Sequence, residues 1–169
     1  MMKKLEIGEI IAVAIIVIAL SSGFLSAYPS VPALKEISPT TISTFIGGSW
    51  QLSYYYSGTG SYSHEYNLQL LGNNELMFEN LTDSLGDYLM ILYVVFPSHS
   101  AAYSYLKNNV IGNVNTINGI TYSVYSYGYI TMIQIVKNNY YLQLGYIGNS
   151  TIIPTSKLLN LANYILTYE

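Results

Sequence analysis

An uninterrupted apolar run near the start of the chain sets the strongest limit on how this sequence can fold. Lys3 and Lys4 precede eleven apolar residues, from Ile10 to Leu20, and small or apolar residues continue to Ala27. This pattern is typical of an export signal, and the longer stretch approaches the ~20 residues that cross a bilayer as a helix. The organisation expected is a cytoplasmic N-region at 1–9, a transmembrane anchor or signal segment at 10–27, a linker at 28–38 and an extracytoplasmic domain at 39–169.

The lysines also predict the orientation of this segment. Lys3 and Lys4 lie before the apolar run, and the next lysine is Lys35. Positive charge is retained on the cytoplasmic side, so the bulk of the chain is expected outside the cell membrane, which the chain crosses once. Cleavage after Gly23 or Ala27 would instead release a secreted domain.

The start of the chain also resembles a type IV prepilin leader. Lys3, Lys4 and Gly8 precede a long apolar segment, and that family is cleaved after the glycine. Glu9 directly follows Gly8, whereas the family usually places its glutamate several residues further in, and Glu6 stands where the leader tends to be basic. The resemblance covers this leader alone and implies, as an alternative, a subunit of a surface filament.

Few residues of this chain carry charge, and that excludes several functions. Charged residues make up 9%, the net charge is −3, and the chain has no cysteine and no arginine. Without cysteine, disulfides and thiolate metal sites are impossible. Without a basic patch, nucleic-acid binding is not expected. The 19 tyrosines, with serine, asparagine and threonine, supply neutral polar groups, and the composition resembles that of exported proteins of heat- and acid-loving archaea.

Periodicity in residues 39–169 predicts a single α+β domain. Tyr62 to Leu70 alternates in polarity, as expected of a half-buried strand, and Tyr88 to Phe96 is apolar on both faces, as expected of a central strand. Asn80 to Asp87 is interpreted as a polar loop. Tight turns between strands favour one mostly antiparallel sheet of about six or seven strands with the helices packed on one face. The expected elements are helices at 39–46, from 98 and from 155 or 156, and strands at 50–56, 62–70, 76–78, 88–96, 120–127, 130–136 and 140–147.

Residues suited to catalysis occur, but not in catalytic patterns. His64-Glu65 lies on a predicted strand, where neighbours point to opposite faces, and the second histidine of a metalloprotease motif is missing. His99 could be combined with Asp83 or Asp87, but no nucleophile elbow is present. We therefore expect no catalytic, metal-binding or cofactor-binding residues and no cofactor, with a small secreted hydrolase as a further alternative.

Two sequons and a set of tyrosines are the remaining candidate sites. Asn80 and Asn149 each begin an N-glycosylation sequon in a predicted loop. Tyrosines on the predicted strands make a binding face, because an exposed tyrosine buries a large area on contact. We expect this face to bind an envelope protein or a surface polymer, as part of a non-catalytic envelope component. The binding-face residues are Tyr54, Tyr56, Tyr125, Tyr127 and Tyr141.

Overall fold

The computed structural model describes residues 34–63 and 68–167 of the chain. The expected N-region, the anchor or signal segment and the first part of the linker lie outside the described residues, as does His64. Residues 34–38 of the linker precede the first helix in extended form.

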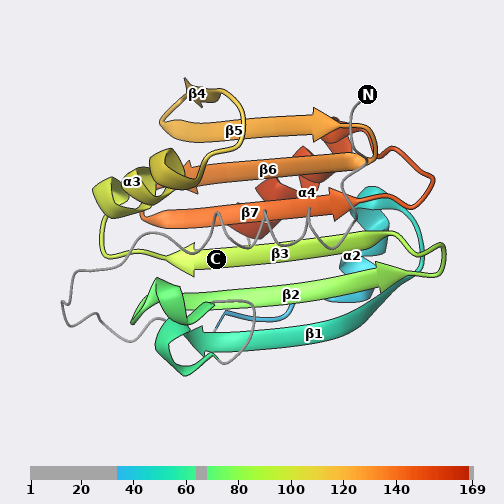
Figure 1. Ribbon diagram of the computed structural model, residues 1–169, viewed down its shortest axis with the longest axis horizontal. Coiled ribbons are helices and arrows are strands. Elements are labelled where there is room, and N and C mark those ends of the chain that lie inside the picture. Colours follow the sequence, from blue (N-terminus) through green and yellow to red (C-terminus); the bar gives the residue numbers. More distant parts are fainter. Residues whose placement is uncertain (1–33, 64–67, 168–169) are drawn as a thin grey trace, which may run out of the picture.

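Seven antiparallel strands form one sheet in the order β1-β2-β3-β7-β6-β5-β4 (Figure 1). This confirms the predicted α+β class and the single antiparallel sheet. β3 pairs with β2 on one side and β7 on the other, so the strand predicted to be central is central. The strands are β1 (Trp50–Thr59), β2 (Glu75–Asp83), β3 (Tyr88–Val95), β4 (Val114–Ile117), β5 (Ile120–Tyr127), β6 (Ile130–Lys137) and β7 (Tyr140–Ile147).

Helices cover both faces of the sheet, so the prediction that they pack on one face is wrong. In Figure 1, α3 (His99–Asn109) lies in front of the sheet, and α2 (Pro39–Ile46) and α4 (Thr155–Thr167) lie behind it. β3 and β6 are buried on both faces, and each apolar face needs a cover to exclude water. We call the two sides the α2–α4 face and the α3 face.

Alternate residues of β2, β3, β6 and β7 contribute to two separate cores. Ile133 of β6 packs with Ile42 of α2 and Leu161 of α4, whereas Val136 of the same strand packs with Leu106 of α3. The separation follows from the pleat, because successive side chains of a strand point to opposite faces.

The helices begin where their sequence signals predict. The Ser38 side chain accepts a hydrogen bond from the Thr41 amide, and Ser98 accepts one from the Ala101 amide in the same way. The predicted inward residues of α3 are buried, and α4 begins at Thr155. Leu159 of α4 is 36% exposed.

Three strand predictions are wrong. Residues 62–63 and 68–70 of the predicted strand 62–70 are not in a strand: Tyr62 belongs to a 3₁₀ turn, η1 (Gly60–Tyr62), and 68–70 belong to another, η2 (Leu68–Leu71), and these turns close over the end of the α3 face. A Cβ at Gly60 would lie 2.5 Å from the Leu68 carbonyl oxygen, so glycine permits the close approach of these turns. β2 continues through the first residues of the predicted loop 80–87, and β4 was not predicted. Three strands therefore precede α3 and four follow it.

Candidate functional site

All five tyrosines of the predicted binding face lie on the α3 face of the sheet. Tyr54 and Tyr56 pack against the core beneath α3, and Tyr141 belongs to that core. Tyr125 is paired with Met132, and Tyr127 with Ile130. These two β6 residues lie an even number of positions from Val136, which packs under α3, so they point to the same face. The chain therefore gathers tyrosines from β1, β5 and β7 on one side, although these strands are far apart in the sequence.

Tyr141 does not belong to an accessible surface. Its side chain is 0% exposed beneath α3, where its ring meets that of Tyr105 edge-on, with 4.9 Å between centroids. Its hydroxyl accepts from Gln134 Nε2 at 2.9 Å and donates to Gln143 Oε1 at 2.6 Å. Burial raises the pKa of Tyr141, so the hydroxyl stays neutral. Including Tyr141 in the binding face is corrected: this residue holds α3 to the sheet.

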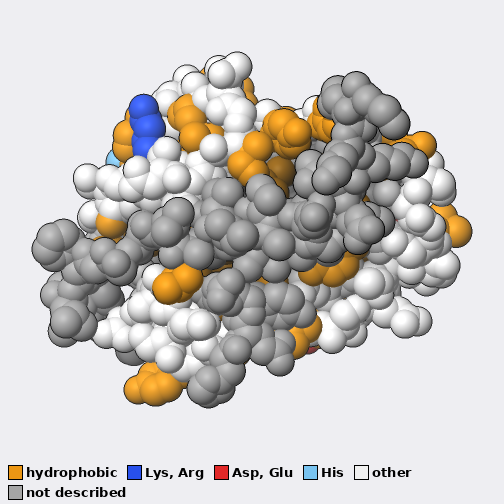
Figure 2. All heavy atoms as spheres, in the orientation of Figure 1, with side chains coloured by type: hydrophobic (Ala, Val, Ile, Leu, Met, Phe, Trp, Pro, Cys, Tyr) orange, Lys and Arg blue, Asp and Glu red, His pale blue; other side chains and the backbone are white. Residues whose placement is uncertain are grey.

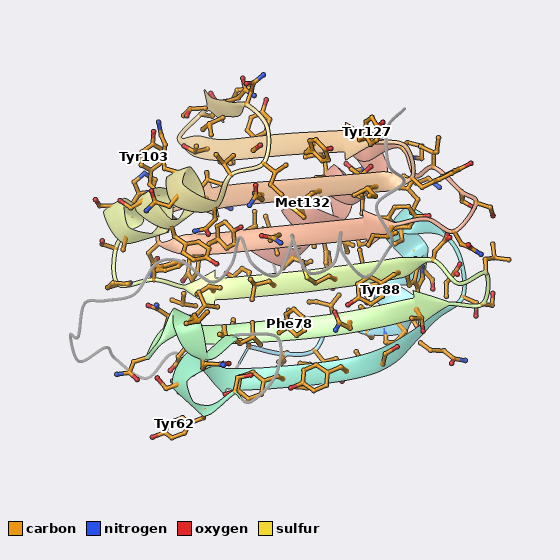
Figure 3. The ribbon with its side chains drawn as sticks, in the orientation of Figure 1. Tyr62, Phe78, Tyr88, Tyr103, Tyr127 and Met132 are labelled. Atoms are coloured by element: carbon orange, nitrogen blue, oxygen red, sulfur yellow. The ribbon has the colours of Figure 1, made fainter. Side chains whose placement is uncertain are left out.

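The rest of the face forms what we call the tyrosine–methionine surface. α3 contacts β6 and β7 near the β6–β7 turn, and η1 and η2 close the same end beside β1. Figure 3 shows Phe78, Tyr88 and Met132 on this side of the sheet. Tyr127 is 62% exposed, Tyr125 is 36% exposed, and the two methionines are 6% exposed each. The surface consists of Tyr54, Tyr88, Met90, Tyr125, Tyr127 and Met132.

No charged side chain of a described strand points to the α3 face. The register places uncharged residues at every position of this side. Gly145 stands between Met90 and Met132 in one cross-strand row, and because it has no side chain, the two methionines lie next to each other. In Figure 2, which views this face, most of the described surface is hydrophobic or uncharged, and lysine colour appears at one place at the upper left. Such a surface suits a neutral ligand, because a charge brought onto it would lose water without gaining a counter-charge.

Two buried amides on this face each have one atom without a hydrogen-bond partner. They are the Oδ1 acceptor of Asn80 on β2, a residue 2% exposed, and the Nε2 donor of Gln143 on β7, a residue 1% exposed. Buried polar atoms are nearly always paired, so these two atoms mark places where a water molecule or a ligand's polar group would bond. Sequence reasoning missed both; the available signal was an amide in the middle of an otherwise apolar strand.

Comparisons with known proteins identify no relative. No family model, no curated protein and no solved structure matches the chain. The case for a binding role therefore rests on the geometry of the α3 face.

The acidic residues near the β2–β3 turn are engaged in holding loops together. Asp83 Oδ1 accepts from the amides of Leu85 at 2.7 Å and Asp87 at 2.9 Å. Asp87 is 4% exposed; its Oδ2 accepts from the Tyr146 hydroxyl at 2.6 Å and its Oδ1 from the Asn149 amide at 2.7 Å. Burial, and then the bond to Asp87, raise the pKa of Tyr146. These carboxylates are therefore acceptors for the fold.

The histidine of α3 lies far from these acids. His99 Nδ1 is 2.7 Å from the Asn138 carbonyl oxygen at the β6–β7 turn. Asp87 is bonded to Asn149, beyond the opposite end of β7, and an eight-residue strand is about 25 Å long. His99 is therefore not brought together with Asp83 or Asp87. Among the described residues, no cluster of three or more His, Cys, Asp or Glu could hold a metal ion.

The two sequons lie in different surroundings. Asn149 is exposed in the loop after β7, as predicted, and its Nδ2 donates to the Leu85 carbonyl at 3.1 Å. Asn80 was expected in a loop, and that placement is wrong, because Asn80 is buried within β2. A glycan on Asn80 would require its side chain to leave the sheet, whereas Asn149 is accessible. Modification of either asparagine stays a prediction.

A buried carboxyl beneath α2 was missed by sequence reasoning. Glu79 of β2 is 0% exposed; its Oε1 accepts from the Ile37 amide at 2.6 Å and its Oε2 has no partner. Burial raises its pKa from 4.5 to about 7, the Ile37 bond lowers it, and the charge of Glu36 raises it again. This carboxyl fastens the extended residues before α2 to the sheet.

The predicted anchor segment, residues 10–27, lies outside the described residues. Within the part that the structure does describe, every helix is too short or too polar to cross a membrane.

Proposed function

We propose that this chain is a membrane-tethered domain on the extracytoplasmic side, a non-catalytic component of the cell envelope that binds an uncharged protein or surface polymer. The observation that carries the proposal is the tyrosine–methionine surface, which has no charged strand residue and two buried amides with unpaired atoms. The apolar segment at 10–27 supplies the tether.

The surface has the chemistry of a contact face for a neutral ligand. Tyrosine gives large, rigid contact area at low entropic cost, and methionine adapts its shape to the partner. The Asn80 acceptor and the Gln143 donor can be satisfied by amide or hydroxyl groups. Asn80 lies two strands and two residues away from Gln143, which separates them by about 12 Å. That spacing favours a ligand that is an extended polypeptide or polymer over a small molecule.

The start of the described chain supports a tether beside edge strand β1. The Leu34 carbonyl accepts from the Tyr55 hydroxyl at 2.8 Å and from Ser57 Oγ at 3.1 Å. Ile37 is bonded to Glu79, so the end of the linker is fixed to the sheet. The described chain therefore begins beside β1, at the edge of the sheet.

The proposal is tested with single substitutions in the full chain. Tyr125→Asp places a charge on the tyrosine–methionine surface, and Tyr62→Asp places one on a 78% exposed residue outside it. Each tagged variant is expressed in the native host and purified from its membranes in mild detergent. We expect Tyr125→Asp to lower the yield of a co-purified stoichiometric partner at least tenfold and Tyr62→Asp to leave it unchanged. Equal yields from both variants would refute binding through this face.

The tether is tested separately on the same membranes. A transmembrane anchor resists extraction with alkaline carbonate and leaves the C-terminal domain open to protease added outside the cell. Full release of the chain into the carbonate wash would refute the tether while leaving the binding face intact.

A further inference from the structure

The extended residues 34–38, which we call the pre-α2 segment, are fastened to the sheet by hydrogen bonds. The Leu34 carbonyl accepts from the Tyr55 hydroxyl at 2.8 Å and from Ser57 Oγ at 3.1 Å. Three residues further on, the Ile37 amide donates to Glu79 Oε1 at 2.6 Å. Figure 1 shows the blue coil that leads into α2 behind β1 and β2. The bond to Glu79 is therefore the one that depends on a carboxyl group.

Glu79 lies beneath this segment, out of contact with water. The residue is 0% exposed, its bonding partner Ile37 is 7% exposed, and Glu79 Oε2 has no hydrogen-bond partner among the described residues. A carboxylate taken out of water costs free energy unless it is paired, so the group takes up a proton instead. Burial accordingly raises the pKa of Glu79 from 4.5 to about 7. The carboxyl is therefore neutral in mildly acidic water and charged in mildly alkaline water.

Among the described residues, no cation lowers the pKa of Glu79. The charge that acts on Glu79 is that of Glu36, which belongs to the pre-α2 segment and raises the pKa further. Lys35, next to Glu36, is exposed, and Lys157 of α4 lies beside Gly47, past the far end of α2. Ionisation of Glu79 therefore sets two negative groups against each other, one on the sheet and one on the segment that the sheet holds.

The described elements around Glu79 bring no other charge close to it. The titratable side chains that face it from the adjacent strands are phenols, Tyr55 on β1 and Tyr93 on β3. The helix α2 contains no charged residue. Glu75 and Asp83 share the face of Glu79 on β2, but each is four residues away, about 13 Å along the strand. The charge opposed to Glu79 thus comes from the segment that covers it.

Displacement of the pre-α2 segment is the simplest way for water to reach an ionised Glu79. β2 is paired with β1 on one side and β3 on the other, so moving the carboxyl itself would break two ladders. The pre-α2 segment belongs to no strand and is held by the bonds of Leu34 and Ile37. Its displacement hydrates both carboxyl oxygens and takes Glu36 away from Glu79. Such local opening needs less free energy than unfolding of the sheet.

We propose that Glu79 and the pre-α2 segment form a proton-operated latch: the protonated carboxyl holds residues 34–38 on the sheet, and loss of the proton favours their release while the strands stay paired. The five released residues extend about 17 Å and lengthen the linker to the anchor at 10–27 by that amount. The domain then searches a larger volume around its anchor. This consequence rests on the proposed tether, whereas the latch itself depends on described residues alone.

Proton binding sets the direction of the latch. In the closed state the pKa of Glu79 is about 7, and in the open state water restores the ordinary value of 4.5. The closed state therefore binds more protons between these values, so raising the pH shifts the equilibrium toward the open state. The shift is absent below pH 4.5 and levels off above pH 7. We expect the open fraction to increase at least tenfold between pH 5 and pH 8.

Hydrogen exchange of single backbone amides in the full chain measures this opening. The chain is kept in mild detergent micelles, and each exchange rate is divided by the rate of the same amide in an unstructured peptide at the same pH. The Ile37 amide reports on the latch, and the Ile133 amide of central strand β6 reports on unfolding of the sheet. Glu79→Gln, which cannot ionise, is the test variant, and Glu75→Gln is the matched control on the same strand.

We expect protection of Ile37 to fall at least tenfold from pH 5 to pH 8 in the native chain and in Glu75→Gln, and to stay constant in Glu79→Gln. At pH 8, Ile37 should be at least tenfold less protected than Ile133 and insensitive to sub-denaturing urea, because local opening exposes little surface.

Constant protection of Ile37 in the native chain would overturn the latch, and this result requires no variant to fold. Equal protection of Ile37 and Ile133, with equal sensitivity to urea, would show that the whole domain unfolds and would also overturn it. An equal fall in Glu79→Gln would assign the pH dependence to another group, with the same consequence. None of these results depends on the anchor, which carbonate extraction tests separately.

Discussion

On the α2–α4 face, two helices pack on the sheet and on each other, with the rings of Phe45 and Tyr164 5.0 Å apart. On the α3 face, the cover provided by the described residues is α3 with the two 3₁₀ turns, at the end near the β6–β7 turn. The strands themselves are equally apolar on both sides at the centre of the sheet, as β3 shows. The difference in described cover therefore comes from the elements between the strands.

The polar groups of the two faces behave differently as well. On the α2–α4 face the Tyr146 hydroxyl is bonded to the buried Asp87, and the buried Glu79 carboxyl, whose pKa is raised to about 7, takes up a proton below that pH. On the α3 face, atoms of Asn80 and Gln143 have no partner, and neither amide can change its protonation. A bound water molecule or a ligand would satisfy them.

Truncating one core residue on each face is the strongest test of this comparison. Leu144→Ala on the α2–α4 face opens a cavity beneath two helices and is expected to lower the free energy of unfolding by about 4 kcal/mol. Met132→Ala on the α3 face is expected to cost about 2 kcal/mol, at the low end for a buried methionine, because Met132 is 6% exposed and lies beyond the cover of α3. Urea unfolding followed by circular dichroism measures both. Equal losses would mean that the two faces are equally well covered, contrary to the comparison.

The closed parts of the fold were the parts that local sequence signals could predict. Ser38 and Ser98 cap their helices, Asn138 adopts the positive φ of 55° that a hairpin turn needs, and the inward positions of α3 follow from their spacing. Each of these depends on neighbours within a few residues. The apolar character of β3 likewise predicted its central place, because a strand buried on both faces needs no alternation.

The site depended on contacts that no local pattern encodes. Five tyrosines could be assigned to strands, but their sharing of one face follows from register across strands distant in sequence. The burial of Tyr141 is decided by where α3 lies, and nothing in 140–147 specifies it. The alternation of 62–70 predicted a strand, whereas Gly60 lets η1 and η2 pack closely and gives Leu68 a place in the core.

The pH dependence of unfolding is expected to come from the α2–α4 face, where Glu79 is buried. Because the folded pKa of Glu79 is about 7 and its ordinary value is 4.5, the folded state binds more protons between these values. This proton binding stabilises the folded state by about 3 kcal/mol. The stabilisation is fully present below pH 4.5 and is lost as the pH rises through 7. Glu79→Gln keeps an acceptor for the Ile37 amide without a charge. We expect the variant to unfold with much less dependence on pH and to be the more stable protein at pH 8.

The opposite trend would show that Glu79 is ionised in the fold and paired. Denaturant midpoints at pH 4 and pH 8 decide between the two, with Glu75→Gln as the control. Glu75 begins β2, four residues before Glu79, and is half-buried, so its substitution should leave the pH dependence in place.

Removing single hydroxyls compares bonded and exposed tyrosines. Tyr146→Phe leaves Asp87 Oδ2 without its buried donor and is expected to cost about 2 kcal/mol. Tyr127→Phe, at a 62% exposed residue, should change the free energy of unfolding by less than about 0.5 kcal/mol. Thermal melts of both variants measure the difference. A similar loss of stability at both positions would mean that the hydrogen bond between Tyr146 and Asp87 contributes no more than the exposed hydroxyl of Tyr127.

The smallest expected effect has the opposite sign and bears most directly on function. Asn80→Leu keeps the size of the side chain and removes a buried acceptor that has no partner in the fold, so it should stabilise the protein by about 1 kcal/mol. If Asn80 is kept for a ligand, the same variant should lose co-purified partner several-fold. Polar groups that lower stability are expected where binding is selected, so a gain in stability together with a loss of partner would support a binding role for Asn80. A gain in stability with undiminished partner binding would place the ligand elsewhere on the face. A loss in stability would show that Asn80 stabilises the fold.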